Sequence, residues 1–227
     1  MQYQIIGGLL PSVDVTLRAG ESLYTESGGM AWMTGDLKME TNTRGGLGAG
    51  LRRALAGESL FMTTYSCQSG EATITFTPEA PGTVLAFELQ AGQSLICQKD
   101  AFMAAQQSVT LEMHFRKRLG AGLFGGEGFI LQKVTGPGLV FLELAGDMRE
   151  YTLGAGQVMR VDPGHIGLYE PSVDYDIEQV KGLTNALFSG EGLFLATLRG
   201  PGRIWLQSMP LANLAAKLSQ YIPKSGS

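Results

Sequence analysis

Three glutamates recur in one short motif and are the first candidates for chemistry. Glu58, Glu127 and Glu191 each follow a glycine and precede a small residue and two large apolar residues. Carboxylates repeated at one structural position could bind cations or pair with arginine and lysine side chains. Alternatively, each carboxylate could cap its own turn by accepting hydrogen bonds from backbone N–H groups. We favour the turn-capping interpretation, because repeated positions usually serve packing and turns.

A short basic patch is the second candidate. It consists of Arg116, Lys117 and Arg118, and residues 52–53 form a smaller arginine pair. Such clusters can contact anionic lipid or RNA, but at a strand end they are commonly solvated charges, which is the interpretation that we favour. The net charge of −4 and the pI near 5.3 argue against general nucleic-acid binding, which depends on phosphate neutralisation, without excluding it.

Residues typical of catalysis or cofactor binding do not converge in this sequence. His114 and His165 are the two histidines, and they lack metal-ligand spacing. Neither a nucleophile motif GxSxG nor a phosphate loop GxxxxGK[ST] occurs. Residues 120–125, GAGLFG, have a GxGxxG-like form, but no long helix is expected after them, as a dinucleotide site would require. We therefore predict no catalytic residue, no metal, no cofactor and no enzymatic activity.

Composition narrows the class of protein. Glycine accounts for 32 of 227 residues, 44% are hydrophobic and 17% are charged, which disfavours disorder. No apolar run is long enough for a spanning helix, and the first residues lack a basic, then apolar, signal peptide. Cys67 and Cys97 have no CxxC partner, so we expect two reduced thiols. These features together predict a cytoplasmic location.

The chain contains a threefold internal repeat with three landmarks. The first landmark is Ala-Gly-Glu or Ala-Gly-Gln, at 19–21, 91–93 and 155–157. The second is the Gly-Glu motif described above. The third is a turn glycine, which we assign to Gly70, Gly136 and Gly200. The same order occurs three times with similar intervals, which indicates tandem copies of one unit.

The elements around these landmarks alternate between apolar and polar residues, as half-buried antiparallel strands do. Examples are residues 13–17, 84–89 and 149–153 before the first landmark, and 22–25, 94–98 and 158–161 after it. Leucine-bearing, glycine-rich segments at 47–56, 119–125 and 183–189 are expected to form helical turns. They could be buried between units or exposed as apolar tips for a partner or membrane surface. A helix with one leucine stripe is predicted for 210–221.

We predict an all-β chain of three tandem β-sandwich or double-stranded β-helix-like modules with a short C-terminal helix. The predicted boundaries are 1–71, 72–137 and 138–209, followed by the helix and tail at 210–227. Small modules bury little core alone, so the three should share sheets. The strand at 203–207 resembles those at 3–6, 73–76 and 139–142, and a spare strand leaves an open edge. We expect a neighbouring copy to cover it, with Trp32 and Trp205 as core or interface anchors.

Four motifs carry a resemblance to a known family. They are 124–130 (FGGEGFI), 135–138 (TGPG), 171–176 (PSVDYD) and 200–208 (GPGRIWLQS). With them, nearly the whole chain resembles the altered-inheritance-of-mitochondria family, whose bacterial members are uncharacterised cytosolic proteins. The resemblance implies three modules per chain, each like a subunit of the tryptophan RNA-binding attenuation protein, and a homotrimer arranged as a nine-module ring. It brings no catalytic residues.

These observations lead to one main hypothesis and two alternatives. The main hypothesis is a non-enzymatic, ring-forming assembly or scaffold protein whose partner is itself. One alternative is a ring that binds nucleic acid or a small ligand between modules. The other is a peripheral organiser that contacts a membrane surface through the apolar tips. The mitochondrial relatives are linked to inner-membrane organisation. An Arg-rich presequence is missing, so that location does not carry over.

Overall fold

The alternating sequence pattern is borne out in a computed structural model, which describes residues 1–26, 29–42, 62–117, 129–179 and 194–222. In β2 (Ser12–Arg18), Val13, Val15 and Leu17 are buried and the residues between them are partly exposed. Strands dominate the described residues, and α3 (Leu211–Ser219) is the α-helix among them. The prediction of an all-β chain with a C-terminal helix is confirmed.

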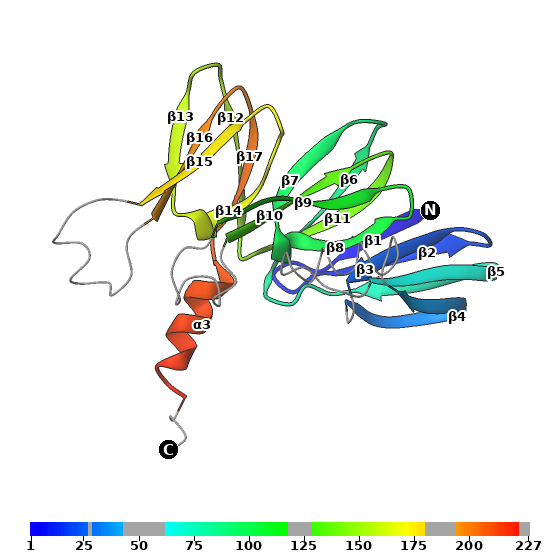
Figure 1. Ribbon diagram of the computed structural model, residues 1–227. Helices are drawn as coiled ribbons and strands as arrows, with labels where there is room; N and C mark the ends of the chain where they lie inside the picture. The colour runs from blue at the N-terminus through cyan, green and yellow to red at the C-terminus, as the bar shows by residue number, and fades with distance from the viewer. Residues whose placement is uncertain (27–28, 43–61, 118–128, 180–193, 223–227) are drawn as a thin grey trace.

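The described strands form three sheets (Figure 1). The largest has eight strands: β1 (Gln2–Ile6), β2, β3 (Ser22–Glu26), β4 (Met30–Asn42), β5 (Met62–Phe76), β6 (Gly82–Leu89), β8 (Phe102–Gln106) and β11 (Gly138–Ala145). A second has six: β7 (Ser94–Gln98), β9 (Thr110–Lys117), β10 (Phe129–Thr135), β12 (Met148–Leu153), β14 (Ile166–Tyr169) and β17 (Gly202–Gln207). The third has β13 (Val158–Val161), β15 (Asp174–Gln179) and β16 (Phe194–Arg199). Short 3-10 turns occupy Lys99–Ala101 and Pro163–His165.

The hydrogen-bonded partners of β5 and β11 lie on the other side of a predicted module boundary. β5 runs through the boundary at 71/72, and its C-terminal part pairs with β2 and β4. β11, expected to begin the third module, pairs with β6 and β8 of the second. These ladders reach Phe76 and Ala145. The division into three modules stays a prediction.

The expected sharing of sheets along the chain is present. β3 pairs with β8, and β7 pairs with β14, so each pairing joins one stretch of the sequence to the next. The hydrophobic core is shared as well, because one cluster contains Tyr24, Val140 and Trp205. Trp205 is buried, as an anchor should be, whereas Trp32 is exposed.

The spare strand lies at the N-terminal end of the chain. Among the described strands, β1 pairs with β2 alone, whereas β17 lies between β12 and β14. The segment at 203–207 is therefore an interior strand and not the open edge that its similarity to 3–6 suggested. Figure 1 shows β4 and β13 at opposite ends of the molecule, with the other strands between them.

The C-terminal helix begins where the sequence predicted. Pro210 is the residue at its N-cap, and the helix runs from Leu211 to Ser219. It projects away from the sheets in Figure 1, and Leu218 on its apolar stripe is exposed. Its first turns alone pack near the body, where Pro210 and Leu211 line a cavity.

Candidate functional site

The repeated glutamates lie outside the described residues. This holds for Glu58, Glu127 and Glu191, and for the leucine-bearing segments at 47–56, 119–125 and 183–189. Whether these carboxylates cap turns or bind cations stays a prediction.

The basic patch begins at the end of a strand, as expected. The backbones of Arg116 and Lys117 close β9, opposite Ile130 and Phe129 of β10. Arg118 lies outside the described residues.

The two histidines lie in unrelated surroundings. Nδ1 of His165 is 2.8 Å from the carbonyl oxygen of Gln207, so this ring has a backbone partner. His114 lines a cleft with Lys133 and Tyr175. Partial burial, together with the nearby charge of Lys133, lowers the pKa of His114. The histidines therefore do not form one site.

The first sequence landmark is the same hydrogen-bonded turn in all three copies. Its last side chain accepts a hydrogen bond from the backbone N–H three residues earlier: Arg18 to Glu21 (2.9 Å), Gln90 to Gln93 (2.7 Å) and Gly154 to Gln157 (2.6 Å). The glycine between has a positive φ each time, at 85°, 81° and 76° for Gly20, Gly92 and Gly156, which explains the residue type. These Glu and Gln side chains therefore serve the turn.

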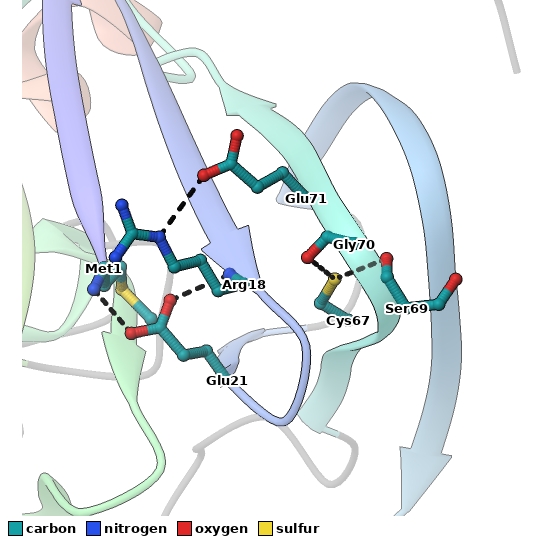
Figure 2. A network of polar contacts seen from close by, with 7 residues as sticks. All are labelled: Met1, Arg18, Glu21, Cys67, Ser69, Gly70 and Glu71. Atoms are coloured by element: carbon teal, nitrogen blue, oxygen red, sulfur yellow. Dashed lines mark hydrogen bonds and ion pairs between the residues drawn. The ribbon is translucent and has the colours of Figure 1, made fainter.

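Glu21 has additional partners, shown in Figure 2. The amino group of Met1 donates to its carboxylate at 2.5 Å, and this hydrogen bond is the main reason that the pKa of Glu21 is lowered. Arg18 also reaches Glu71, with 3.3 Å between Nε and Oε1. Beside them, the Cys67 thiol donates to the carbonyl oxygens of Ser69 and Gly70. These contacts connect Met1 and the turn after β2 with the middle of β5.

The third landmark was assigned wrongly in the first copy. The N–H groups of Gly136 and Gly200 donate to the carbonyl oxygens of Gln93 and Gln157. In the first copy the corresponding donor to Glu21 is Cys67, not Gly70. The sequence spacing agrees. Gly136 follows Gly126 by the same number of residues as Gly200 follows Gly190, and the residue at that spacing after Gly57 is Cys67. Gly70 lies in extra residues of β5 that the other copies lack.

A β-bulge marks one strand of each copy. Pairing of β4 with β5 skips the residue between Met30 and Trp32. The pairing of β8 with β11 skips Met103, and that of β14 with β17 skips Gly167. The first residue paired after the bulge is Trp32 in β4, Ala104 in β8 and Leu168 in β14. These three residues therefore occupy equivalent positions in the three strands.

Consecutive copies of the repeat are joined by two strand pairings, which we call junctions. The strands that correspond to a third junction, β13 and β4, do not pair with each other. β3 and β7, which each follow the first landmark, pair with the bulged strands β8 and β14 of the next copy. β13 is the corresponding strand of the last copy, and the first part of β4 is the bulged strand of the first. Among the described residues, β13 pairs with β16 and β4 pairs with β5, so each keeps an open side.

Side chains at the internal junctions are buried, whereas their counterparts on the open strand β4 are exposed. Ala104 and Leu168, which lie after the bulge at the two internal junctions, are 0% exposed, whereas Trp32 is 56% exposed. Ala105 and Tyr169 are 0% and 2% exposed, against 39% for Met33. Val158, at the start of β13, is 45% exposed. The apolar edge of β4 thus lacks the cover that its internal counterparts have, whereas on β13 Val158 is exposed and Val161 is 9% exposed. Sequence reasoning missed these edges, although a tryptophan at a strand position occupied elsewhere by Ala104 was a signal.

A cavity of about 360 Å³ lies between the sheets and the first turns of α3. Its wall includes Glu143, Gln98 and Gln207. The Gln207 side chain donates to the Gln98 amide oxygen at 2.9 Å, and Glu143 accepts a bond from the Glu79 N–H at 3.3 Å. Burial raises the pKa of Glu143 to about 8. The polar side chains on this wall therefore have partners within the fold.

Comparisons with known proteins identify the family. The model of the mitochondrial biogenesis AIM24 family matches residues 3–209. The chain belongs to the AIM24 family. An uncharacterised protein of Streptococcus pyogenes serotype M6 is 32% identical over 224 residues, which cover 95% of this chain and 88% of that protein. The crystal structure of a Streptococcus pyogenes protein has a TM-score of 0.78 at 28% identity, covering 97% of this chain and 99% of the other.

The AIM24 match confirms the resemblance read from the four motifs and adds no residue roles. In the parts of this AIM24 chain that the structure describes, no group of three or more His, Cys, Asp or Glu side chains could hold a metal. Within the same parts, no helix is long and apolar enough to cross a membrane. Among the described residues of this AIM24 chain, β13 and β4 lack the junction partner that β3, β7, β8 and β14 have.

Proposed function

We propose that this chain is a non-enzymatic assembly protein that closes into a homotrimeric ring through its two open edges. The observation that supports the proposal is the repeated junction: it is made twice inside the chain and is split a third time between β13 and β4. Unlike, complementary edges join copies head to tail, and such contacts generate a ring when the rotation closes. Closure also removes edge strands, which otherwise invite uncontrolled pairing.

The number of copies follows the family resemblance, which implies nine modules and therefore three chains. A ring of this kind presents each surface feature three times, which suits a scaffold that holds another macromolecule by repeated contacts. The scaffold role is proposed because no convergent catalytic set is apparent in the sequence.

Light scattering coupled to size exclusion tests the assembly. The expected mass is three times that of the 24.2 kDa chain across a wide range of protein concentrations. A mass of one chain at every concentration would contradict the proposal. A stable mass of two or four chains would keep the head-to-tail junction and reject the trimer.

A further inference from the structure

We infer that β13 of one copy pairs antiparallel with residues 32–34 of β4 in the next copy, in one defined register. Val161 lies opposite Trp32, Arg160 opposite Met33, and Met159 opposite Thr34. This inference rests on the proposed ring and specifies its interface residue by residue. The occupant of each open edge is a second copy of this chain.

The register comes from the two internal junctions, which agree with each other. At the first, Thr25 pairs with Ala104 and Tyr24 with Ala105. At the second, Cys97 pairs with Leu168 and Ile96 with Tyr169. Ala104 and Leu168 are each the first paired residue after the bulge.

The other strand of each junction is aligned by the hydrogen-bonded turn. Thr25 and Cys97 lie the same distance along the chain from the capping residues Glu21 and Gln93. The residue at that distance from Gln157 is Val161. The first residue paired after the bulge in β4 is Trp32. One rule therefore describes both internal junctions, and applied to the open edges it places Val161 opposite Trp32.

Burial supports the same pairing. The four aligned residues at the internal junctions, Ala104, Ala105, Leu168 and Tyr169, are almost fully buried, and their counterparts Trp32 and Met33 are not. Burying large apolar side chains stabilises association. The inferred contact joins two unlike edges, β13 of one copy and β4 of the next, and is therefore head to tail.

Disulfide trapping tests the register. Residues directly opposite in a sheet have Cα atoms within the range that a disulfide spans, whereas diagonal neighbours are about 7–8 Å apart and fall outside it. We would combine Met33→Cys with Arg160→Cys, because both positions are exposed. The matched control is Met33→Cys with Val158→Cys. Val158 lies two residues before Arg160 in β13, on the same face of the strand. The native Cys67 and Cys97 are buried and stay in place.

After mild oxidation, the Met33/Arg160 pair should move most of the chain from the monomer band to dimer and trimer bands on a non-reducing gel. The Met33/Val158 control should leave the monomer band nearly unchanged. Mixing the two single variants, Met33→Cys and Arg160→Cys, should give dimers alone, and either by itself should give none.

Two contrary results have different meanings. If light scattering shows three chains but the control links in place of the Met33/Arg160 pair, the register is wrong and the ring stands. Self-linking of Met33→Cys alone would also overturn the inference, because it requires like edges to meet. If neither double variant links and the mass is that of one chain, both the inference and the proposed function fail.

Discussion

Glu143 carries a proton at neutral pH because of where its side chain lies. Burial is the main cause of its raised pKa of about 8, and the charges of Glu79 and Asp100 add to it. Between the ordinary value of 4.5 and about 8, the folded protein holds a proton that the unfolded chain has lost. Stability is therefore full below the unfolded pKa and falls as pH rises through this window.

We predict that Glu143→Gln removes this pH dependence, since an amide keeps the shape without titrating. The wild type should lose roughly 3–4 kcal/mol of unfolding free energy between pH 5 and pH 9 beyond what the variant loses. Thermal unfolding followed by circular dichroism across this range measures the difference. The exposed Glu112→Gln should behave like the wild type, and equal slopes for all three proteins would contradict the assignment.

The two thiols should be inert in the folded protein. Burial raises the pKa of Cys97 to about 12, and the charge of Glu26 contributes, while Cys67 is buried and donates to two carbonyl oxygens. Thiolate is the reactive form, so a thiol reagent should label neither residue in native buffer and both in denaturant. Tyr221→Cys, at a residue that is 74% exposed, should add one thiol that reacts at once. Rapid native labelling of the wild type would show that the burial is wrong.

At the scale of single elements, the capped turn after each first strand contributes measurable stability. We predict that Gln93→Ala and Gln157→Ala each lower the unfolding free energy by about 0.5–1.5 kcal/mol, the ordinary net value of one hydrogen bond. Urea titration measures the loss. Gln90→Ala, at an exposed position in the same turn, keeps the backbone N–H that donates to Gln93 and should cost little. A loss as large for Gln90 as for Gln93 would remove the capping explanation.

Local elements were readable from the sequence because their cause is local. Alternation of Val13, Val15 and Leu17 with polar residues predicted β2, and Pro210 predicted the start of α3. The repeated turn was visible because one glycine conformation and one capping side chain occur in a short motif. Gly70 was misassigned because any glycine at about the right interval matches a pattern, whereas the hydrogen bond of Cys67 identifies the true counterpart.

Long-range features were not readable from the sequence. β5 continues across the predicted boundary at 71/72, and β11, which follows the one at 137/138, pairs back with β6 and β8, because a strand's partners are set by residues far along the chain. The open edges were missed for the same reason. Trp32 looks like an ordinary core or interface residue until its counterparts, Ala104 and Leu168, are seen beneath a neighbouring strand.

At the scale of the whole molecule, the edge of β4 controls assembly in the proposed ring. We predict that Trp32→Glu lowers the mass seen by light scattering to that of one chain, because a charge would be buried in the junction. The fold should survive, since Trp32 is exposed within the chain. Tyr221→Glu, at a residue that is 74% exposed near the end of α3, is the matched control and should keep the larger mass. An unchanged mass for Trp32→Glu would exclude this edge from the interface.

The unlike ends of the chain have a consequence for mixtures of normal and altered copies. A copy damaged at β4 still offers an intact β13, so it would attach to a normal copy and stop further growth there. Such copies act as terminators, and a modest proportion of them would deplete complete assemblies out of proportion to their number. Damage to one edge of one allele would therefore be dominant in a cell that also makes the normal protein.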